Sequence, residues 1–414
     1  MISMKTMIFD TVVIGGGAAG LLASCIAAEN GYNVALIEKN DYLGKKLRIT
    51  GKGRCNVTNN CSVREVIDNI PTGGKFLYGT MSVLPPEKVM SMFEEMGVPL
   101  KTERGNRVFP VSDKSADIVN VLKNRVNAAG VRVLHATAKE ILTDENVVVG
   151  VMTDRDKIEC RCVILCTGGA SYPLTGSDGS GYKLAQNLGH TLIKPRPSLV
   201  PLVENGNDCA KMQGLSLKNV NVTAYDGGKK PIFEGFGEML FTHFGVSGPL
   251  ALSASSHMRD FDNKKYYLEI DLKPALDEKT LDARILRDFA EAQNKDFANS
   301  LGKLCSRLMI PVIIERSKIP PDTKVNSITR EQRKQLIDVF KHFRVDIKGP
   351  RPIDEAIITS GGIELDEINP KTMESKLVNG LFFAGEIINA DAYTGGFNLQ
   401  IAWSTAYAAA NHIY

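Results

Sequence analysis

The sequence predicts an α/β protein in which a Rossmann-like domain is interrupted by inserted units. Three observations support this prediction. Strand and helix patterns alternate in the first third of the chain, a glycine fingerprint joins the first strand to the first helix, and strand-and-loop patterns return after residue 351. A chain of 414 residues also exceeds the size at which one hydrophobic core stops growing, so more than one compact unit is expected.

The N-terminal third has the pattern of a βαβ unit. DTVVIGGG (residues 10–17) predicts a buried strand, AAGLLASCIAAENG (18–31) a helix and NVALIEKN (33–40) a second strand. Further helical patterns lie at 86–96 and 114–129. Strands joined by helices in this way are typical of a parallel sheet.

The middle of the chain changes character. Short alternating runs separated by Gly, Asp and Lys indicate an antiparallel β unit, and charged amphipathic runs then indicate helices. We therefore expect one nucleotide-binding domain that is split by an insertion. The predicted boundaries are 1–192 for its first part, 193–274 for the β unit, 275–342 for the helical unit, 343–354 for a return through the β unit, and 355–414 for the second part of the domain.

The glycine fingerprint has the spacing G-x-G-x-x-G and lies where a dinucleotide site requires it. Gly15 permits the tight turn after the strand, Gly17 lets the backbone approach a pyrophosphate, and Gly20 lets the helix pack on the strand. Glu38 ends the second strand, where a carboxylate accepts hydrogen bonds from an adenosine ribose. The fingerprint predicts a bound dinucleotide but does not separate FAD from NAD.

Two features favour FAD. GLFFAGE (380–386) provides a distant strand and turn with an acid, as expected where a flavin is held from both ends of the chain, and no second fingerprint of the same kind follows. NADH or NADPH would then visit the flavin as a transient co-substrate. An NAD-dependent dehydrogenase that uses the first fingerprint remains the alternative.

Composition narrows the choice of partners. The chain has 50 basic and 47 acidic residues, interspersed, with a net charge of +3, so nucleic-acid and membrane partners are not expected. The N-terminus enters a strand pattern without a signal-peptide pattern, and the eight cysteines favour reduced thiols in a cytoplasmic protein. We expect a small-molecule substrate, and the oligomeric state stays open.

The cysteines do not predict a metal site. Cys160, Cys162 and Cys166 have the same parity along one strand, but no second set of ligands with metal-binding spacing accompanies them. TGKGRCNVTNN (50–60) instead predicts a cofactor cradle, in which Gly53 brings the backbone close and Cys55 is a small neighbour.

Several motifs in order resemble one known family: VVIGGGAAG, GKGRCNVTN, RVFPVS, TGGASYPLTGSDGSGYKLAQNLGH, LFTHFGVSGP and GLFFAGEIINADAYTGGFNLQIAWSTAY. The sequence is similar to the BaiN-like family of FAD-binding oxidoreductases, which includes proteins described as aminoacetone oxidases and as bile-acid reductases. The resemblance implies an FAD domain of the glutathione-reductase type, split around a β-barrel-like unit and a small helical unit.

The resemblance also implies a set of cofactor contacts. These are Gly15, Gly17, Ala18 and Ala19 at the pyrophosphate; Glu38 and Lys39 at the adenosine ribose; Ala138 near adenine; Thr167 and Gly168 in a loop under the dinucleotide; Gly385, Glu386 and Asp391 along the ribityl and phosphate; and Arg54, Cys55, Asn56, Gly396, Asn398, Leu399 and Gln400 beside the isoalloxazine.

The predicted activity follows from the same resemblance. We expect NAD(P)H-driven reduction of a C=C bond in an unsaturated ketone of steroid or bile-acid type. The alternatives are FAD-dependent oxidation of a small amine or aminoketone, and a flavin-binding protein without turnover. His243 and Tyr393 are the candidate proton donors.

Overall fold

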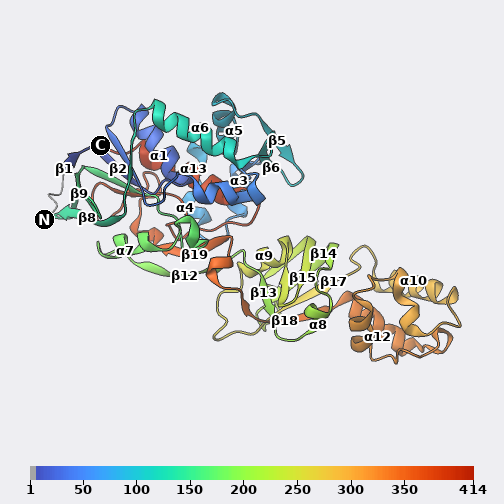
Figure 1. Cartoon of the computed structure of the whole chain (residues 1–414). Helices are drawn as coiled ribbons and strands as arrows, with labels where there is room; N and C mark the ends of the chain where they lie inside the picture. The colour runs from blue at the N-terminus through green and yellow to red at the C-terminus, as the bar shows by residue number, and fades with distance from the viewer. Residues whose placement is uncertain (1–5) are drawn as a thin grey trace. The chain divides into compact units, whose positions relative to one another are not determined.

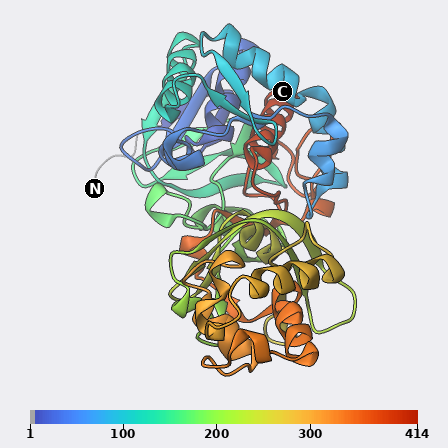
Figure 2. The same cartoon turned by 90° about the vertical axis from the view of Figure 1, so that its right-hand side faces the viewer.

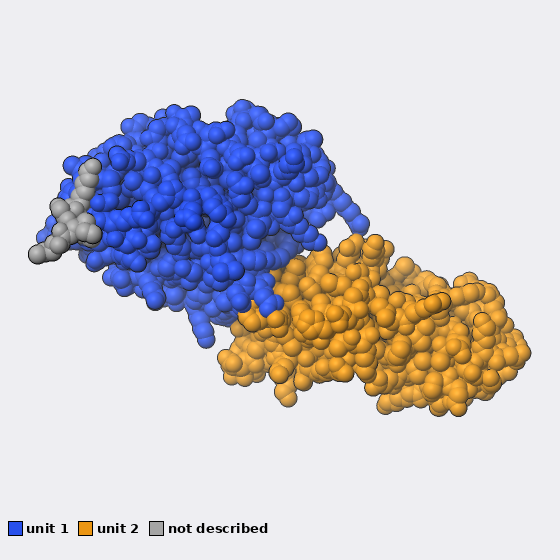
Figure 3. Space-filling model, in the orientation of Figure 1, with its two compact units in different colours: residues 1–198, 353–414 blue, residues 199–352 orange. Residues whose placement is uncertain are grey.

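The structure is a computed structural model, and it describes residues 6–414. The chain forms two compact units (Figures 1 and 3). Unit 1 comprises Met1–Ser198 and Ile353–Tyr414, and unit 2 comprises Leu199–Pro352. Unit 2 is therefore inserted into unit 1, and each unit has its own hydrophobic core.

A five-stranded parallel sheet is the centre of unit 1, and its strand order is β20-β11-β2-β3-β7. The α/β prediction is confirmed. Valine, isoleucine and leucine dominate the central strands because both faces of the sheet are covered. The bounds are β2 Thr11–Ile14, β3 Val34–Glu38, β7 Arg132–His135, β11 Cys162–Leu165 and β20 Leu381–Phe383.

Helices from both ends of the chain pack together in unit 1. Helix α1 follows β2 directly and contacts both α6 and the C-terminal helix α13. Nearly all of α13 is buried, and its Trp403 indole donates to the carbonyl of Val57 at 2.9 Å. The bounds are α1 Ala18–Glu29, α2 Lys45–Ile49, α3 Val63–Asp68, α4 Gly74–Val83, α5 Pro86–Glu95, α6 Ser115–Ala128, α7 Ser180–Gln186 and α13 Phe397–Ala410.

Three smaller sheets complete unit 1. One has the order β1-β10-β9-β8, the second is the pair β12-β19 and the third has the order β4-β6-β5. The bounds are β1 Thr6–Ile8, β4 Thr58–Asn59, β5 Leu100–Glu103, β6 Arg107–Pro110, β8 Ala138–Asp144, β9 Val147–Thr153, β10 Lys157–Glu159, β12 Leu192–Ser198 and β19 Ile358–Ile363.

Unit 2 contains a closed six-stranded barrel with the order β13-β16-β15-β14-β17-β18. Buried and exposed residues alternate along its strands, as in β18, because successive side chains point to opposite faces. The bounds are β13 Leu202–Glu204, β14 Ser216–Tyr225, β15 Phe233–Thr242, β16 Gly245–Ser247, β17 Tyr266–Asp271 and β18 Phe343–Pro350.

The helical segment of unit 2 lies beside the barrel strands in Figure 1, and it is seen in front of them in Figure 2. Sequence patterns predicted a separate helical unit, whereas the barrel and the helices here share one core in which Phe340 of α12 and Phe343 of β18 are both fully buried. The bounds are α8 Asp208–Lys211, α9 Pro249–Ser255, α10 Glu278–Ala290, α11 Ile310–Ser317 and α12 Arg330–Lys341. Among residues 6–414, no helix is both long and apolar enough to span a membrane.

Candidate functional site

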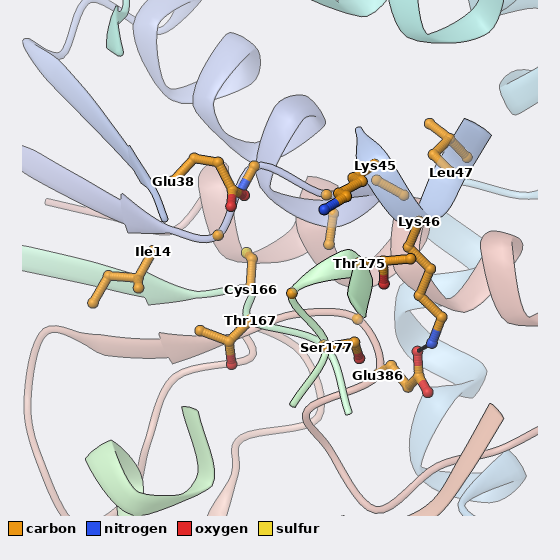
Figure 4. A pocket seen from close by; sticks show the side chains of 18 of the residues that line it. Ile14, Glu38, Lys45, Lys46, Leu47, Cys166, Thr167, Thr175, Ser177 and Glu386 are labelled. Carbon is orange, nitrogen blue, oxygen red and sulfur yellow. Dashed lines mark hydrogen bonds and ion pairs between the residues drawn. The ribbon is translucent and has the colours of Figure 1, made fainter. Parts of the chain in front are cut away.

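A cavity of about 210 Å³ lies in unit 1, at the carboxyl ends of the parallel strands (Figure 4). Ile14 at the end of β2, Glu38 at the end of β3 and Cys166 just after β11 all line it. Ligands of open α/β sheets bind outside this edge of the sheet. The topology thus places the cavity where a dinucleotide is expected.

The glycine loop that precedes α1 forms one wall of the cavity. Gly15 has φ of +105°, and a Cβ there would lie 2.6 Å from the carbonyl oxygen of Cys166. A Cβ on Gly20 would lie 1.7 Å from the carbonyl oxygen of Gly15, so this glycine serves helix packing. Gly17 differs, because a Cβ there would meet no protein atom within 4 Å and would enter the open cavity.

Helix α1 presents its N-terminus to this space without competition from its own side chains. Its N-cap is Gly17, no side chain caps it, and its first turn contains no acid. The free N–H groups and the positive end of the helix dipole favour a phosphate there.

Glu38 holds the glycine loop in place from the next strand. One carboxylate oxygen accepts from the Gly16 N–H at 2.8 Å, and the other accepts from the backbone and side-chain nitrogens of Asn40 at 2.7 and 2.6 Å. The side chain is only 8% exposed, so these bonds lie in a sheltered site. Glu38 therefore shapes the loop as well as lining the cavity.

Two buried side-chain hydroxyls in the cavity lining make no hydrogen bond within the protein. The hydroxyls of Thr167 and Ser177 are buried, have no partner and line the cavity. The side-chain oxygen of Asn56 is also buried and without a partner. Buried polar groups are nearly always hydrogen-bonded in native proteins. The Thr167 and Ser177 hydroxyls and the uncapped helix fit a dinucleotide with its phosphates and hydroxyl groups, whereas Asn56 lies outside the cavity lining.

Lys46 and Glu386 form a charged pair in the cavity lining, and Figure 4 shows their side chains pointing toward each other. The Lys46 ammonium lies 2.6 Å from one oxygen of Glu386 and donates to the Ser171 hydroxyl at 2.8 Å. The other oxygen of Glu386 accepts from Ser171 at 3.0 Å and from the Thr359 N–H at 2.9 Å. This network joins the segments after β11 and β20 and fixes the Glu386 carboxylate.

A second helix N-terminus reaches the cavity from the C-terminal end of the chain. Helix α13 begins after Gly396, has no side-chain cap and has no acid in its first turn. Asn398 and Leu399 from this turn line the cavity. The Asn398 amide is locked against Ala392, accepting from its N–H at 2.9 Å and donating to its carbonyl at 2.8 Å.

The TGKGRCNVTNN segment lies apart from the cavity lining, except for Thr50. Arg54 pairs with Glu103 and with Asp113, and its guanidinium lies 4.0 Å from the centre of the Phe109 ring. Cys55 is fully buried, and burial raises the pKa of its thiol to about 12. A thiol of that pKa is protonated at neutral pH and is a poor nucleophile.

Two C-terminal residues that were expected to contact the cofactor form hydrogen bonds with protein groups instead. Asp391 is fully buried and accepts from the hydroxyls of Ser198 and Ser360, each at 2.9 Å. Gln400 is fully buried too, and its amide nitrogen donates to the carbonyl of Leu84 at 2.8 Å. Both hold unit 1 together near the site.

The structure brings most of the predicted cofactor residues around one cavity. Those that line it are Gly15, Gly17, Ala18, Ala19, Glu38, Lys39, Ala138, Thr167, Gly168, Gly385, Glu386, Asn398 and Leu399. Those outside its lining are Gly20, Gly53, Arg54, Cys55, Asn56, Asp391, Gly396 and Gln400.

Sequence reasoning missed Lys46, Ser171 and Ser177. Lys46 belongs to the GKKL run and lies on α2, but its contact with Glu386 spans 340 residues and leaves no local pattern. The signal for Ser177 was its glycine-rich surrounding, TGSDGSG.

The two candidate proton donors lie in different units. Tyr393 is in unit 1, in the loop before α13, where its N–H donates to the carbonyl of Asn69 at 3.0 Å. His243 is in unit 2, exposed in the turn between β15 and β16, with its ring edge-on to Phe244 at 5.0 Å. Among residues 6–414, no group of three or more His, Cys, Asp and Glu is placed to hold a metal ion.

The fold and the cavity together define a Rossmann-type dinucleotide-binding protein. The chain belongs to the family described as HI0933-like protein Rossmann domain, which matches residues 9–412. With this membership, the chain is an FAD-dependent oxidoreductase.

Three curated relatives match almost the full chain. A 3-dehydro-bile acid delta(4,6)-reductase from Clostridium scindens is 28% identical and covers 96% of this chain and 97% of that protein. A ribosomal RNA dihydrouridine synthase from Haemophilus influenzae is 29% identical and covers 97% of each chain. Its namesake from Escherichia coli is 27% identical and covers 98% of each.

Solved structures share the fold at low identity. The open conformation of a flavocytochrome c3 fumarate reductase has a TM-score of 0.52 at 15% identity and covers 98% of this chain and 78% of that chain. A 3-ketosteroid delta1-dehydrogenase from Sterolibacterium denitrificans has a TM-score of 0.50 at 12% identity and covers 98% and 99%.

Proposed function

We propose that the protein reduces a C=C bond conjugated to a carbonyl group, with NADH or NADPH as the source of electrons. The observation that carries the proposal is the dinucleotide cavity of unit 1 in a chain whose full-length relatives include two kinds of reductase. A delta(4,6)-reductase acts on double bonds conjugated to a ketone, and dihydrouridine is uridine whose C5=C6 bond, conjugated to a carbonyl, has been reduced. The two named reactions share one chemistry.

We further propose uridine in ribosomal RNA as the substrate and an unsaturated steroid ketone as the second candidate. Dihydrouridine synthases from two organisms match this chain over at least 97% of its length, which supports the first choice. The bile-acid reductase supports the second. The charge composition predicts no nucleic-acid partner, whereas uridine in ribosomal RNA as the substrate requires RNA binding.

The chain's own residues would seat the cofactor. The N-terminus of α1 would hold the pyrophosphate, Glu38 the adenosine ribose, and the Thr167 and Ser177 hydroxyls the polar atoms of the dinucleotide. FAD bound there supplies hydride transfer. The uncapped N-terminus of α13 would stabilise negative charge placed at it.

A C=C reduction also needs a proton for the second carbon. We propose Tyr393 as its donor, because it lies in the loop that ends at α13, only five residues before Asn398 on the cavity wall. A tyrosine that donates a proton in the rate-limiting step would leave cofactor reduction intact but slow product formation. Tyr393→Phe should therefore lower turnover while the rate of flavin reduction by NAD(P)H stays unchanged.

The substrate is tested by supplying both candidates to the holoenzyme with NADPH under anaerobic conditions. Mass spectrometry of the digested RNA should show a uridine that has gained two hydrogen atoms. Gain of two hydrogens by a steroid 4-en-3-one, with RNA unchanged, would establish the second candidate instead. Reaction with neither substrate, while a small amine reduces the flavin, would contradict the reductase proposal.

A further inference from the structure

The outer face of the barrel carries an ordered stack of aromatic and cationic side chains. Tyr225 on β14 pairs in register with Tyr267 on β17, and their rings stack with centroids 4.9 Å apart and planes 16° apart. The guanidinium of Arg344, on the adjacent strand β18, lies 3.9 Å from the centre of the Tyr267 ring. We call these three side chains the aromatic stack.

The aromatic stack faces away from the barrel core. Tyr266 and Leu268, on either side of Tyr267, are buried, so Tyr267 takes the opposite face of β17. The Arg344 side chain is 55% exposed. The strands that carry these side chains, β14, β17 and β18, are labelled in Figure 1.

Lysines surround the end of the barrel where the stack lies. Lys229 and Lys230 are exposed in the turn between β14 and β15, Lys265 is exposed just before β17, and Lys348 is exposed on β18. Across residues 6–414, none of these four ammonium groups forms an ion pair with a carboxylate. We call them the lysine rim.

Two of the acids at this end of the barrel form ion pairs. Asp226 pairs with Lys264 at 2.5 Å, and Asp346 pairs with Arg344 at 2.6 Å. Glu234 and Glu269 lie on the same outer face, both in register with Thr223, two residues along β14 from Tyr225. The loops 226–232 and 260–265 together hold four lysines and three aspartates, and Lys348 adds a further cation, so the turn end carries a small excess of positive charge.

A stack of this kind also stabilises the barrel, because cross-strand aromatic pairs contribute to sheet stability. Barrel stability alone does not require four unpaired lysines around the stack. Aromatic rings and guanidinium planes next to unpaired cations are instead the chemistry that holds unpaired bases and their phosphates.

We propose that the aromatic stack and the lysine rim form a docking surface for single-stranded or looped RNA. Bases stack against the Tyr225 side of the aromatic stack, and the phosphates run along the lysine rim, whose charge is complementary to theirs. The inference rests on the uridine form of the proposed function. It assigns unit 2 the task of holding RNA, while unit 1 holds the cofactor.

The test measures binding of a fluorescein-labelled RNA hairpin with a uridine-rich loop to the full-length holoenzyme by anisotropy, over a range of salt concentrations. The double variant Lys229→Ala/Lys230→Ala should bind more weakly, with the slope of log K against log salt reduced by about 0.7 for each lysine removed. Tyr225→Ala should lose about tenfold in affinity. Tyr225→Phe keeps the ring and should bind like the wild type.

A matched control removes two exposed lysines elsewhere in unit 2, with Lys279→Ala/Lys334→Ala on α10 and α12. This control should bind RNA with wild-type affinity. If Tyr225→Ala fails to fold, the lysine pair and Tyr225→Phe still test the surface. Wild-type affinity and salt slope in the lysine double variant would overturn the proposal, and so would equal loss in the control.

The outcome separates this inference from the proposed function. The rate of flavin reduction by NADPH and the reduction of a steroid enone should be unchanged in every surface variant. If the wild type reduces the enone but does not bind RNA, the docking surface is overturned while the reductase chemistry stands. If RNA binds at the lysine rim but no uridine is reduced, the surface stands and the substrate proposal fails.

Discussion

At the residue scale, Glu38 shows how one side chain serves the fold and the site together. Its position at the end of the second strand, about 20 residues beyond the fingerprint, predicts contact with a ribose. The three hydrogen bonds that it accepts from Gly16 and Asn40 were not predictable, because they depend on how the glycine loop curls back over β3.

Glu38→Gln should weaken FAD binding by about tenfold or more, because a buried carboxylate that accepts several hydrogen bonds is replaced by an amide with only one acceptor. Titration of the apoprotein with FAD, followed by quenching of flavin fluorescence, measures this. Asp41→Asn, an exposed neighbour, is the matched control and should bind FAD normally. Equal affinities in both variants would contradict the role of Glu38.

Other residue-scale predictions show the limit of motif reasoning. The TGKGRCN run was identified as a cradle, yet Arg54 is held by Glu103 and Asp113, and Cys55 lies in the core. The carboxylates that pair with Arg54 lie about 50 residues further along the chain. Local residue spacing therefore could not predict these ion pairs. A short motif cannot show which of its residues pair with side chains from distant parts of the sequence.

At the element scale, the glycines at the start of helix α1 have two different roles. Gly20 allows the helix to pack closely, and Gly17 leaves room for the ligand in the cavity. Gly20→Ala should destabilise the apoprotein by about 2 kcal/mol or more, because its Cβ would overlap the Gly15 carbonyl oxygen, 1.7 Å away. Gly17→Ala should leave apoprotein stability within about 0.5 kcal/mol and weaken FAD binding, because its Cβ enters the cavity. Urea unfolding and FAD titration of both variants measure these effects. A Gly17→Ala protein with normal FAD affinity would refute the assignment.

His190 joins the start of β12 to the C-terminal segment of unit 1. Its Nδ1 lies 3.1 Å from Glu367 and its Nε2 lies 2.9 Å from the Ser375 hydroxyl. Burial lowers the pKa of His190 below its ordinary value of 6.5, and the nearby Glu367 offsets only part of this effect. The folded state therefore favours the neutral imidazole.

This pKa direction predicts acid sensitivity. Protonation favours the unfolded chain, so the stability that neutral His190 contributes is fully present above about pH 6.5 and is lost as the pH falls from there through the lower folded-state pKa. The melting temperature of the wild type should fall as the pH is lowered from 7.5 to 5.5. Circular dichroism at intervals of about half a pH unit measures this fall. His190→Gln should show a flatter profile, and an unchanged slope would exclude His190 as the cause.

The elements themselves were largely predictable. The βαβ start follows from apolar strand runs and an apolar helix, both dictated by burial on two faces. The closed barrel of the β unit was predicted only from the family resemblance. The alternation of residues along the strands predicts that strands pair, but it does not predict which strands are neighbours.

At the scale of the whole molecule, two separate cores in one chain predict two unfolding transitions. A ligand that binds only unit 1 raises the stability of that unit by mass action, by about 2.7 kcal/mol at a concentration one hundred times its Kd. Differential scanning calorimetry with and without FAD should move one transition upward and leave the other in place. Removal of FAD should reverse the shift, and equal shifts of both transitions would contradict the assignment.

Splitting of the nucleotide domain by an insertion was visible in the sequence, because the strand-and-loop pattern returns after residue 351. The helical segment was harder to assign. Its amphipathic runs predicted helices, but only the shared burial of Phe340 and Phe343 shows that barrel and helices form one unit.

The central claim is that this flavoprotein passes electrons to a carbonyl-conjugated C=C bond. It is tested most directly by reducing the holoenzyme with light under anaerobic conditions and then adding a uridine-containing ribosomal RNA transcript or a steroid 4-en-3-one. The account predicts that one of them restores the oxidised flavin spectrum and gains two hydrogen atoms in the process. A flavin that stays reduced with both and is reoxidised only by oxygen would contradict it.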